Sequence, residues 1–236
     1  VQQNIYRTPE ICTGCCQVVS RAEGYIRGFF YMNIIPAKNF LGALRGFQGS
    51  LPRSQEIADM FTYLQENYHF KNILEFGFNL GHSSTWFLYA FPNAKVVSFD
   101  PKERTISKER TISNVRIWQM QESKFGNRFR FWPNFSTEAI QKYQHQEEPF
   151  DIVFVDAGHT FGAVYDDIET ALHLKIPLIL IDNMELEPQK RAVAAWKENL
   201  QFTKQFKYYT INKDKVEHER YVNLYNVLSY DIQKPV

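Results

Sequence analysis

The sequence predicts one α/β domain, built on a mostly parallel sheet that ends in an antiparallel hairpin. Two observations lead to this fold class. From residue 54 onward, short apolar runs alternate with stretches of helical periodicity. Several of the short runs, such as 152–155 and 178–181, are apolar throughout, which is typical of parallel strands buried on both faces. Strands and helices that alternate in this way form a parallel sheet with helices on both sides.

The expected elements follow one another in a regular order. Ser54 can cap a first helix, in which Ile57, Met60, Phe61 and Leu64 lie on one face. The expected strands are Asn72–Phe76, Lys95–Phe99, Arg128–Trp132, Asp151–Val155 and Pro177–Ile181. The expected helices after these strands are Ser83–Phe91, Thr137–Tyr143, Ala163–Leu172 and Gln189–Leu200. Two final β-like runs with no helical pattern between them should pair as the hairpin and bring the strands to seven, namely Phe206–Ile211 and Tyr221–Leu228.

Residues 1–53 differ from residues 54–236, which we assign to the α/β domain. The stretch 24–36 is aromatic and apolar without a clean period. We interpret residues 1–53 as a cover packed over the domain, with a lid over the active site and a plain structural extension as the alternatives. Three thiols in this region lack a fourth ligand nearby in sequence, so a structural zinc site is not expected and their role stays open. They are Cys12, Cys15 and Cys16.

Composition excludes some classes of protein. The net charge of the 236-residue chain is only +1, which argues against nucleic acid as a partner. No apolar run approaches the roughly 18–20 residues that a membrane span needs. Three clustered cysteines in so long a chain do not make a disulfide framework, so we expect a cytoplasmic protein. The sequence leaves open the oligomeric state, with a homodimer as one option, and whether a leader preceded Val1.

The first two predicted strands end in a pattern that indicates a nucleoside site. Glu75 closes the first strand and is followed by Gly77, Gly81 and Ser83 at the start of a helix. Gly77 allows a sharp turn, and Gly81 allows a ligand to approach the helix without meeting a Cβ. The Gly-x-x-x-Gly spacing differs from that of dinucleotide sites, which argues against an NAD-dependent oxidoreductase. Asp100 closes the second strand, where its carboxylate can accept hydrogen bonds from both ribose hydroxyls of an adenosine.

The fourth and fifth predicted strands end in further polar residues. Asp156 and His159 follow the fourth strand, and Asp182 and Asn183 follow the fifth. Since neighbouring parallel strands end at the same edge of a sheet, we expect Asp156, Asp182 and Asn183 to lie close together. Two carboxylates and an amide oxygen suit Mg²⁺ or Ca²⁺. The alternative is a set of polar strand ends that bind no metal.

The pattern Glu-x-Gly-x-x-x-Gly-x-Ser from Glu75, with Asp100 closing the next strand, resembles the class I S-adenosylmethionine-dependent methyltransferases. The resemblance covers residues 54 to about 228 and implies a Rossmann-like sheet. It implies that the glycine loop contacts the methionine part of the cofactor and that Asp100 holds the ribose. The segment Asn134-Phe-Ser136 is similar to the segment that contacts adenine in the O-methyltransferase branch, so Ser136 joins the expected cofactor contacts, as do Glu75, Ser83 and Asp156.

The acidic strand ends resemble the site residues of two branches of that family. Asp156 with Asp182 and Asn183 resembles the metal-binding set of the catechol-type and caffeoyl-type O-methyltransferases. Those enzymes carry a Lys shortly after the first Asp, whereas this chain has His159. The run Asp-x-x-His-Thr-Phe instead resembles the sugar and macrolide O-methyltransferases, in which this His is the general base.

The sequence therefore predicts an enzyme that transfers a methyl group from S-adenosylmethionine to a hydroxyl group of a small-molecule acceptor. His159 and Asp156 are the expected catalytic residues, assisted by Mg²⁺ or Ca²⁺. The alternatives are a metal-independent N- or carboxyl-methyltransferase and a catalytically silent protein that binds S-adenosylmethionine. The sequence does not identify the acceptor.

Overall fold

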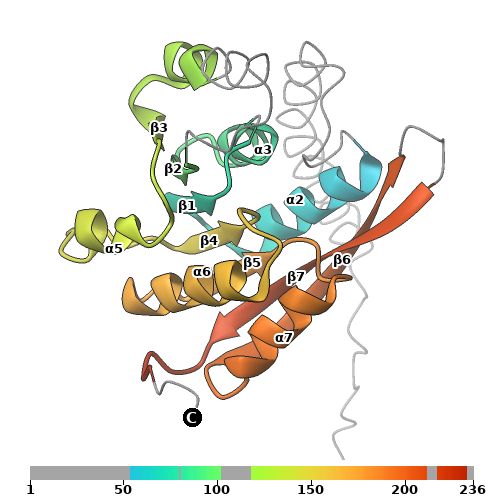
Figure 1. The fold of residues 1–236 in the computed structure, drawn as a ribbon. Coiled ribbons are helices and arrows are strands. Elements are labelled where there is room, and N and C mark those ends of the chain that lie inside the picture. The colour runs from blue at the N-terminus through green and yellow to red at the C-terminus, as the bar shows by residue number, and fades with distance from the viewer. Residues whose placement is uncertain (1–53, 80, 102–117, 212–216, 233–236) are drawn as a thin grey trace, which may run out of the picture.

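The computed structural model describes residues 54–79, 81–101, 118–211 and 217–232. Seven strands form one sheet in the order β3-β2-β1-β4-β5-β7-β6 (Figure 1). The strands β1 to β5 are parallel, whereas β7 is antiparallel to both β5 and β6. The predicted doubly wound sheet with a terminal hairpin is thereby confirmed. The strands are β1 (Asn72–Phe76), β2 (Lys95–Phe99), β3 (Phe129–Trp132), β4 (Ile152–Val155), β5 (Leu178–Ile181), β6 (Leu200–Ile211) and β7 (Glu217–Val227).

Helices cover both faces of the sheet. On one face, α2 and α3 pack against Ile73 and Phe154, which are fully buried. On the other face, α5, α6 and α7 pack against Leu74 and Val153. Residues next to each other in a strand thus enter different cores, which explains why β4 and β5 are apolar at every position. The helices are α2 (Gln55–Asn67), α3 (His82–Ala90), α5 (Glu138–Tyr143), α6 (Phe161–His173) and α7 (Glu187–Ala195), with a 3₁₀ turn η1 (Gly126–Arg128).

Hydroxyl side chains cap the N-termini of two helices. The Ser54 Oγ accepts a hydrogen bond from the Ile57 N–H at 3.4 Å, which confirms the predicted cap of α2. The Thr160 Oγ1 accepts one from the Ala163 N–H at 3.3 Å and caps α6. These caps satisfy backbone donors that have no partner within the helix. The cap of α6 fixes the start of the helix directly after His159, a predicted site residue.

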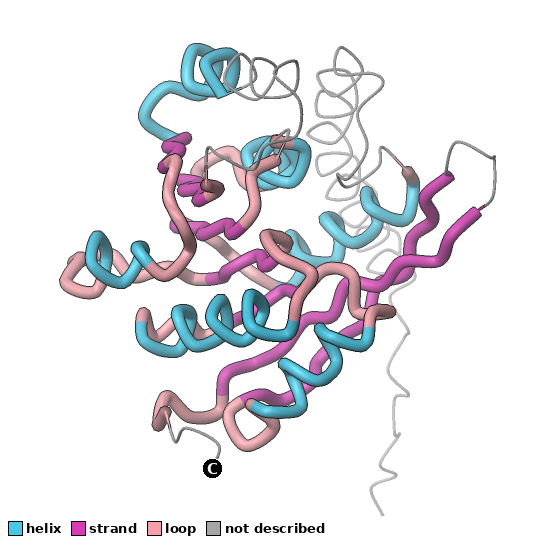
Figure 2. The backbone as a smooth tube through the Cα atoms, viewed as in Figure 1, coloured by secondary structure: helices cyan, strands magenta, loops and turns pink. Residues whose placement is uncertain are grey.

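The bounds of α7 and the start of β6 differ from the prediction. The helix expected over Gln189–Leu200 begins earlier, at Glu187, and ends at Ala195. A turn follows, in which the Leu200 N–H donates to the Trp196 carbonyl, and β6 begins at Leu200 opposite Val227. Pairing across the long hairpin overrides the helical periodicity of this stretch (Figure 2).

The second strand of the hairpin was expected to begin at Tyr221. Instead, Glu217–Arg220 belong to β7, while 212–216 lie outside the described residues. The predicted cover, residues 1–53, and its three cysteines also lie outside the described residues. Within the described part of the chain, no helix has the length and apolar character to cross a membrane.

Candidate functional site

The turn after β1 is fixed by backbone contacts to two neighbouring strands. The Gly77 N–H donates to the Phe99 carbonyl of β2 at 2.8 Å, and Gly77 has φ +98°. A Cβ at this position would overlap the backbone carbonyl of Asp156 at the end of β4. Glycine is therefore needed here for two reasons, its left-handed backbone and the close approach of another chain segment. The glycine turn and Asp156 consequently lie directly against each other.

Gly81 is crowded by protein side chains. It has φ +66° and begins α3. A Cβ here would lie 2.5 Å from the Gln121 Nε2 and 2.7 Å from the Phe78 ring. Packing against these side chains is thus one reason for glycine at this position, in addition to the predicted approach of a ligand. Gln121 is fully buried and donates to the Gly81 carbonyl and the Thr85 Oγ1, each at 2.6 Å. The sequence contained no signal for this role of Gln121.

Glu75, near the end of β1, holds the glycine turn in place through its buried carboxylate. It is completely buried, and its two carboxylate oxygens accept hydrogen bonds from the hydroxyls of Ser83 and Ser98. Glu75 thereby connects β1 with β2 and with the first turn of α3. Burial raises the pKa of Glu75 to about 7, although both serine hydroxyls favour the ionised form. Glu75 and Ser83 thus anchor the glycine turn through hydrogen bonds within the protein.

Asp100 holds the turn from the end of β2. Its Oδ2 accepts a hydrogen bond from the Asn79 N–H at 2.7 Å, and Asn79 has φ +43°. Asp100 is half-buried, and its own N–H donates to the Trp132 carbonyl of β3 at 3.2 Å. After β3, the Ser136 hydroxyl donates to Asp167 of α6, a buried carboxylate for which the sequence suggested no chemistry. The three strands β1, β2 and β3 thus present the predicted cofactor residues at one edge of the sheet.

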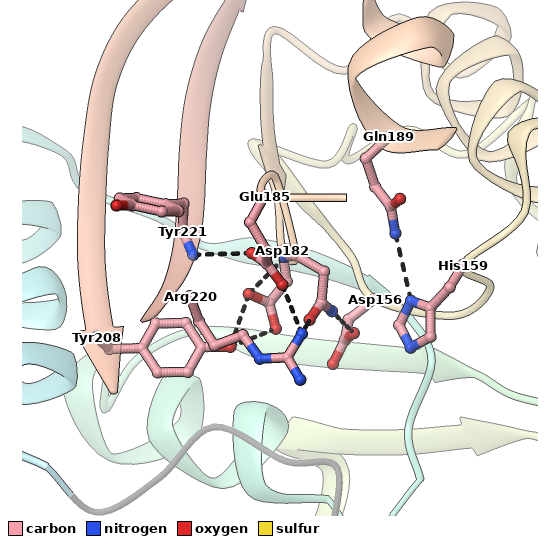
Figure 3. A network of polar contacts seen from close by, with 9 residues as sticks. Asp156, His159, Asp182, Glu185, Gln189, Tyr208, Arg220 and Tyr221 are labelled. Atoms are coloured by element: carbon pink, nitrogen blue, oxygen red, sulfur yellow. Dashed lines mark hydrogen bonds and ion pairs between the residues drawn. The ribbon is translucent and has the colours of Figure 1, made fainter. Parts of the chain in front are cut away.

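The expected acidic set also comes together. The Asn183 Nδ2 donates to the Asp156 Oδ1 at 3.1 Å, and the Asn183 N–H donates to the Asp182 Oδ1 at 2.8 Å (Figure 3). Asn183 has φ +58°, a conformation that asparagine tolerates better than most residues. Asp156, Asp182 and Asn183 therefore form one cluster above β4 and β5.

The hairpin contributes two residues to this cluster that sequence reasoning missed. The buried Tyr208 of β6 donates its hydroxyl to Asp182, at 2.9 Å and 3.0 Å from the two carboxylate oxygens. The Arg220 Nη1 of β7 donates to the Asn183 Oδ1 at 3.2 Å and to the Glu185 Oε1 at 2.5 Å (Figure 3). The strand order explains the proximity of Arg220, because β7 lies next to β5, whereas Tyr208 reaches Asp182 from β6, one strand further out.

The cluster has more negative than positive charge. Burial raises the pKa of Asp182 to about 7. Burial and the nearby charge of Asp182 raise the pKa of Asp156 well above its usual range. Arg220 supplies the cation of the network and is itself paired with Glu185. A divalent ion would relieve the repulsion between the two carboxylates, so charge and donor chemistry both fit Mg²⁺ or Ca²⁺. Among the described residues, no three His, Cys, Asp or Glu side chains gather at one point, so the amide of Asn183 would have to be the third ligand.

His159 lies on the connection between β4 and α6. Its side chain is exposed, and its Nδ1 is 3.3 Å from the Nε2 of Gln189 on α7. Figure 3 shows the imidazole on the side of Asp156 that faces away from Arg220. The same strand end therefore presents both an acid and an imidazole.

A turn with two glycines after β1, an acid at the end of β2 and the strand order 3-2-1-4-5-7-6 define the class I methyltransferase fold. Residues 74–184 match the model of a family described as a methyltransferase domain. The match runs from β1 through Asn183 and so includes the glycine turn, Asp100 and the acidic strand ends, but not the hairpin residues Tyr208 and Arg220. The described part of the chain thus has the fold of the class I S-adenosylmethionine-dependent methyltransferases, and residues 74–184 are similar to a methyltransferase domain. A search of curated proteins found no match.

Solved structures share the fold at low sequence identity. An O-methyltransferase from Bacillus cereus in complex with S-adenosylhomocysteine matches with a TM-score of 0.56 and 16% identity, over 83% of this chain and 90% of that one. The O-methyltransferase TomG from Streptomyces achromogenes, involved in tomaymycin synthesis, matches with 0.55 and 16% over 84% and 90%. The Podospora anserina methyltransferase PaMTH1 matches with 0.55 and 14% over 95% and 100%.

Proposed function

We propose that this protein transfers a methyl group from S-adenosylmethionine to a hydroxyl group of a small-molecule acceptor. One observation carries the proposal: the glycine turn lies directly against Asp156, so that a Cβ on Gly77 would overlap the Asp156 backbone. A donor bound at the turn would have its methyl group beside the cluster of Asp156, Asp182 and Asn183. Methyl transfer proceeds in line, and such proximity supplies much of its rate.

The cofactor would be held by the ends of the first three strands. The turn from Gly77 to Gly81 would contact the methionine part, and Asp100 would accept hydrogen bonds from the ribose hydroxyls. The segment around Ser136 would border the adenine, and Asp156 would border the methionine part from the other side. Glu75 and Ser83 would act by holding the turn, since both Glu75 oxygens already accept hydrogen bonds within the protein.

The acceptor would be activated by the residues after β4 and β5. Asp156, Asp182 and Asn183 would hold Mg²⁺ or Ca²⁺, which when bound would polarise the acceptor hydroxyl and lower its pKa. His159 would accept the proton of that hydroxyl, since a neutral imidazole is a suitable base near neutral pH. Tyr208 would fix the carboxylate of Asp182 through its hydroxyl group.

Two findings support oxygen as the methylated atom and a small molecule as the acceptor. The similar structures from Bacillus cereus and Streptomyces achromogenes are O-methyltransferases by name. The net charge of +1 gives the chain little electrostatic attraction for nucleic acid.

A second candidate is a metal-independent methyltransferase that acts on nitrogen or on a carboxylate. The contacts of the hairpin favour it: Arg220 already places a cation on the Asn183 Oδ1, and Tyr208 already occupies both oxygens of Asp182. In this version Asp156 and Asp182 would only orient the acceptor. The two candidates differ in whether chelation of metal stops the reaction.

Transfer of labelled methyl groups from S-adenosylmethionine to a panel of catechols, other phenols, sugars, amines and carboxylic acids would test the proposal. We expect label in hydroxyl acceptors, stimulation by Mg²⁺ and reversible loss with EDTA. Transfer that survives EDTA would favour the metal-independent candidate. Binding of the cofactor without transfer to any acceptor would instead indicate a catalytically silent protein.

A further inference from the structure

A buried amide from α7 reaches the imidazole that we propose as the base. Gln189 has only 1% of its surface exposed, yet its amide lies 3.3 Å from the Nδ1 of the exposed His159. Gln189 lies in the first turn of α7, and Thr160 caps α6 directly after His159. The contact therefore joins the start of α7 to the residue that precedes the cap of α6 (Figure 3).

The chemistry of a base decides which amide atom must face the ring. If the Nε2 of His159 accepts the proton, the Nδ1 must carry one from the start. Once His159 is protonated, both ring nitrogens are donors, and only the amide oxygen can accept from Nδ1. In the structure the Oε1 of Gln189 is buried and has no hydrogen-bond partner. Rotating the Gln189 amide by half a turn exchanges its Oε1 and Nε2, so that Oε1 can accept a hydrogen bond from the Nδ1–H of His159. The two amide orientations are nearly equal in shape.

We propose that Gln189 is the positioning residue of His159: its Oε1 accepts from Nδ1–H, selects the tautomer with an unprotonated Nε2 and orients that atom toward the acceptor. The inference rests on the proposed role of His159 as base. A neutral amide orients the ring without adding the negative charge that a carboxylate would place beside it. The charged groups on the two segments that carry the pair are Asp156 beside His159 and, on α7, Glu187, Lys190 and Arg191.

Two substitutions of Gln189 separate orientation from simple packing. Gln189→Leu fills much of the same space with an apolar side chain and removes the acceptor. Gln189→Glu restores an acceptor and adds a negative charge beside the ring. The matched control is Gln141→Glu, which adds the same charge at an exposed position on α5. NMR of the His159 ring nitrogens, assigned with His159→Ala, reports tautomer and titration without any need for turnover.

We expect Gln189→Leu to lower kcat at least tenfold with the KM for S-adenosylmethionine nearly unchanged, and to remove the preference for the Nδ1–H tautomer. We expect Gln189→Glu to retain that tautomer and to raise the pKa of His159 by a unit or more. The acidic limb of the pH–rate profile should then move to higher pH, whereas Gln141→Glu should leave it in place. An unchanged tautomer and titration in both Gln189 variants would overturn the inference. If His159→Ala turns over normally, the base proposed for the reaction is wrong, while the NMR result still decides whether Gln189 orients the ring.

Discussion

Replacement of Glu75 by glutamine should change how the stability of this protein depends on pH. Glutamine has nearly the same shape and can still bond to the hydroxyls of Ser83 and Ser98, but it cannot ionise. The carboxyl group of Glu75 is completely buried, and its pKa is about 7 in the folded chain against an ordinary value of 4.5. The folded state thus binds this proton more tightly than the unfolded state does.

The sign of the effect follows from that difference. The contribution of Glu75 to the free energy of unfolding is fully present below pH 4.5 and is lost as pH rises through about 7. The two pKa values correspond to about 3 kcal/mol over the whole range, most of which should be lost between pH 5 and pH 8. Relative to Glu75→Gln, the natural protein should therefore become less stable by about 2–3 kcal/mol over this interval.

Urea denaturation of both proteins at pH 5, 6, 7 and 8 would measure this difference, since contributions from titrating groups that do not interact with Glu75 cancel. Glu66→Gln is the matched control because Glu66 is exposed on α2. We expect the control to run parallel to the natural protein at every pH. A difference between natural protein and Glu75→Gln that stays constant from pH 5 to pH 8 would refute the reasoning, as would one of the opposite sign.

Three further predictions concern the reaction. His159→Ala should lower the rate of methyl transfer by roughly 10²–10⁴-fold and remove the acidic limb of the pH–rate profile; an unchanged profile would exclude His159 as the base. Asp182→Ala should abolish most turnover and weaken Mn²⁺ binding measured by electron paramagnetic resonance, while S-adenosylhomocysteine affinity stays the same; Asp166→Ala on the exposed side of α6 is the control. Deletion of residues 1–40 should leave cofactor affinity nearly intact and reduce turnover, and normal turnover would show that this segment is no lid.

Local patterns predicted the sheet and the positions of the acids. The strands β4 and β5 are apolar at every position, and β2, β4 and β5 are each followed directly by an aspartate, so the pattern alone was enough to place Asp100, Asp156 and Asp182 at one sheet edge. The strand order adds that β1 lies between β2 and β4. It thereby explains why Gly77 meets the backbone of Asp156, a contact that a linear pattern cannot show.

The residues that the sequence did not reveal reach the site from a distance along the chain. Tyr208 lies 26 positions after Asp182, on a strand whose register shifts at an irregularity between Phe202 and Lys204. Such a shift changes which side chains face the site, so period-two alternation does not predict it. Gln121 lies in the helical residues 118–125 and Gln189 lies on α7. In the sequence, a buried glutamine on a helix cannot be distinguished from an exposed one until its partner is known.

Calorimetric titration with S-adenosylhomocysteine tests the central claim, a cofactor site built on the glycine turn and Asp100, most directly. The natural protein should bind in the micromolar range, about −8 kcal/mol. Asp100→Ala should weaken binding at least tenfold, because it removes the expected ribose contacts and the hydrogen bond to the Asn79 N–H. Asp166→Ala, again as the control, should bind like the natural protein. No measurable binding by the natural protein, or an unchanged affinity in Asp100→Ala, would contradict the account.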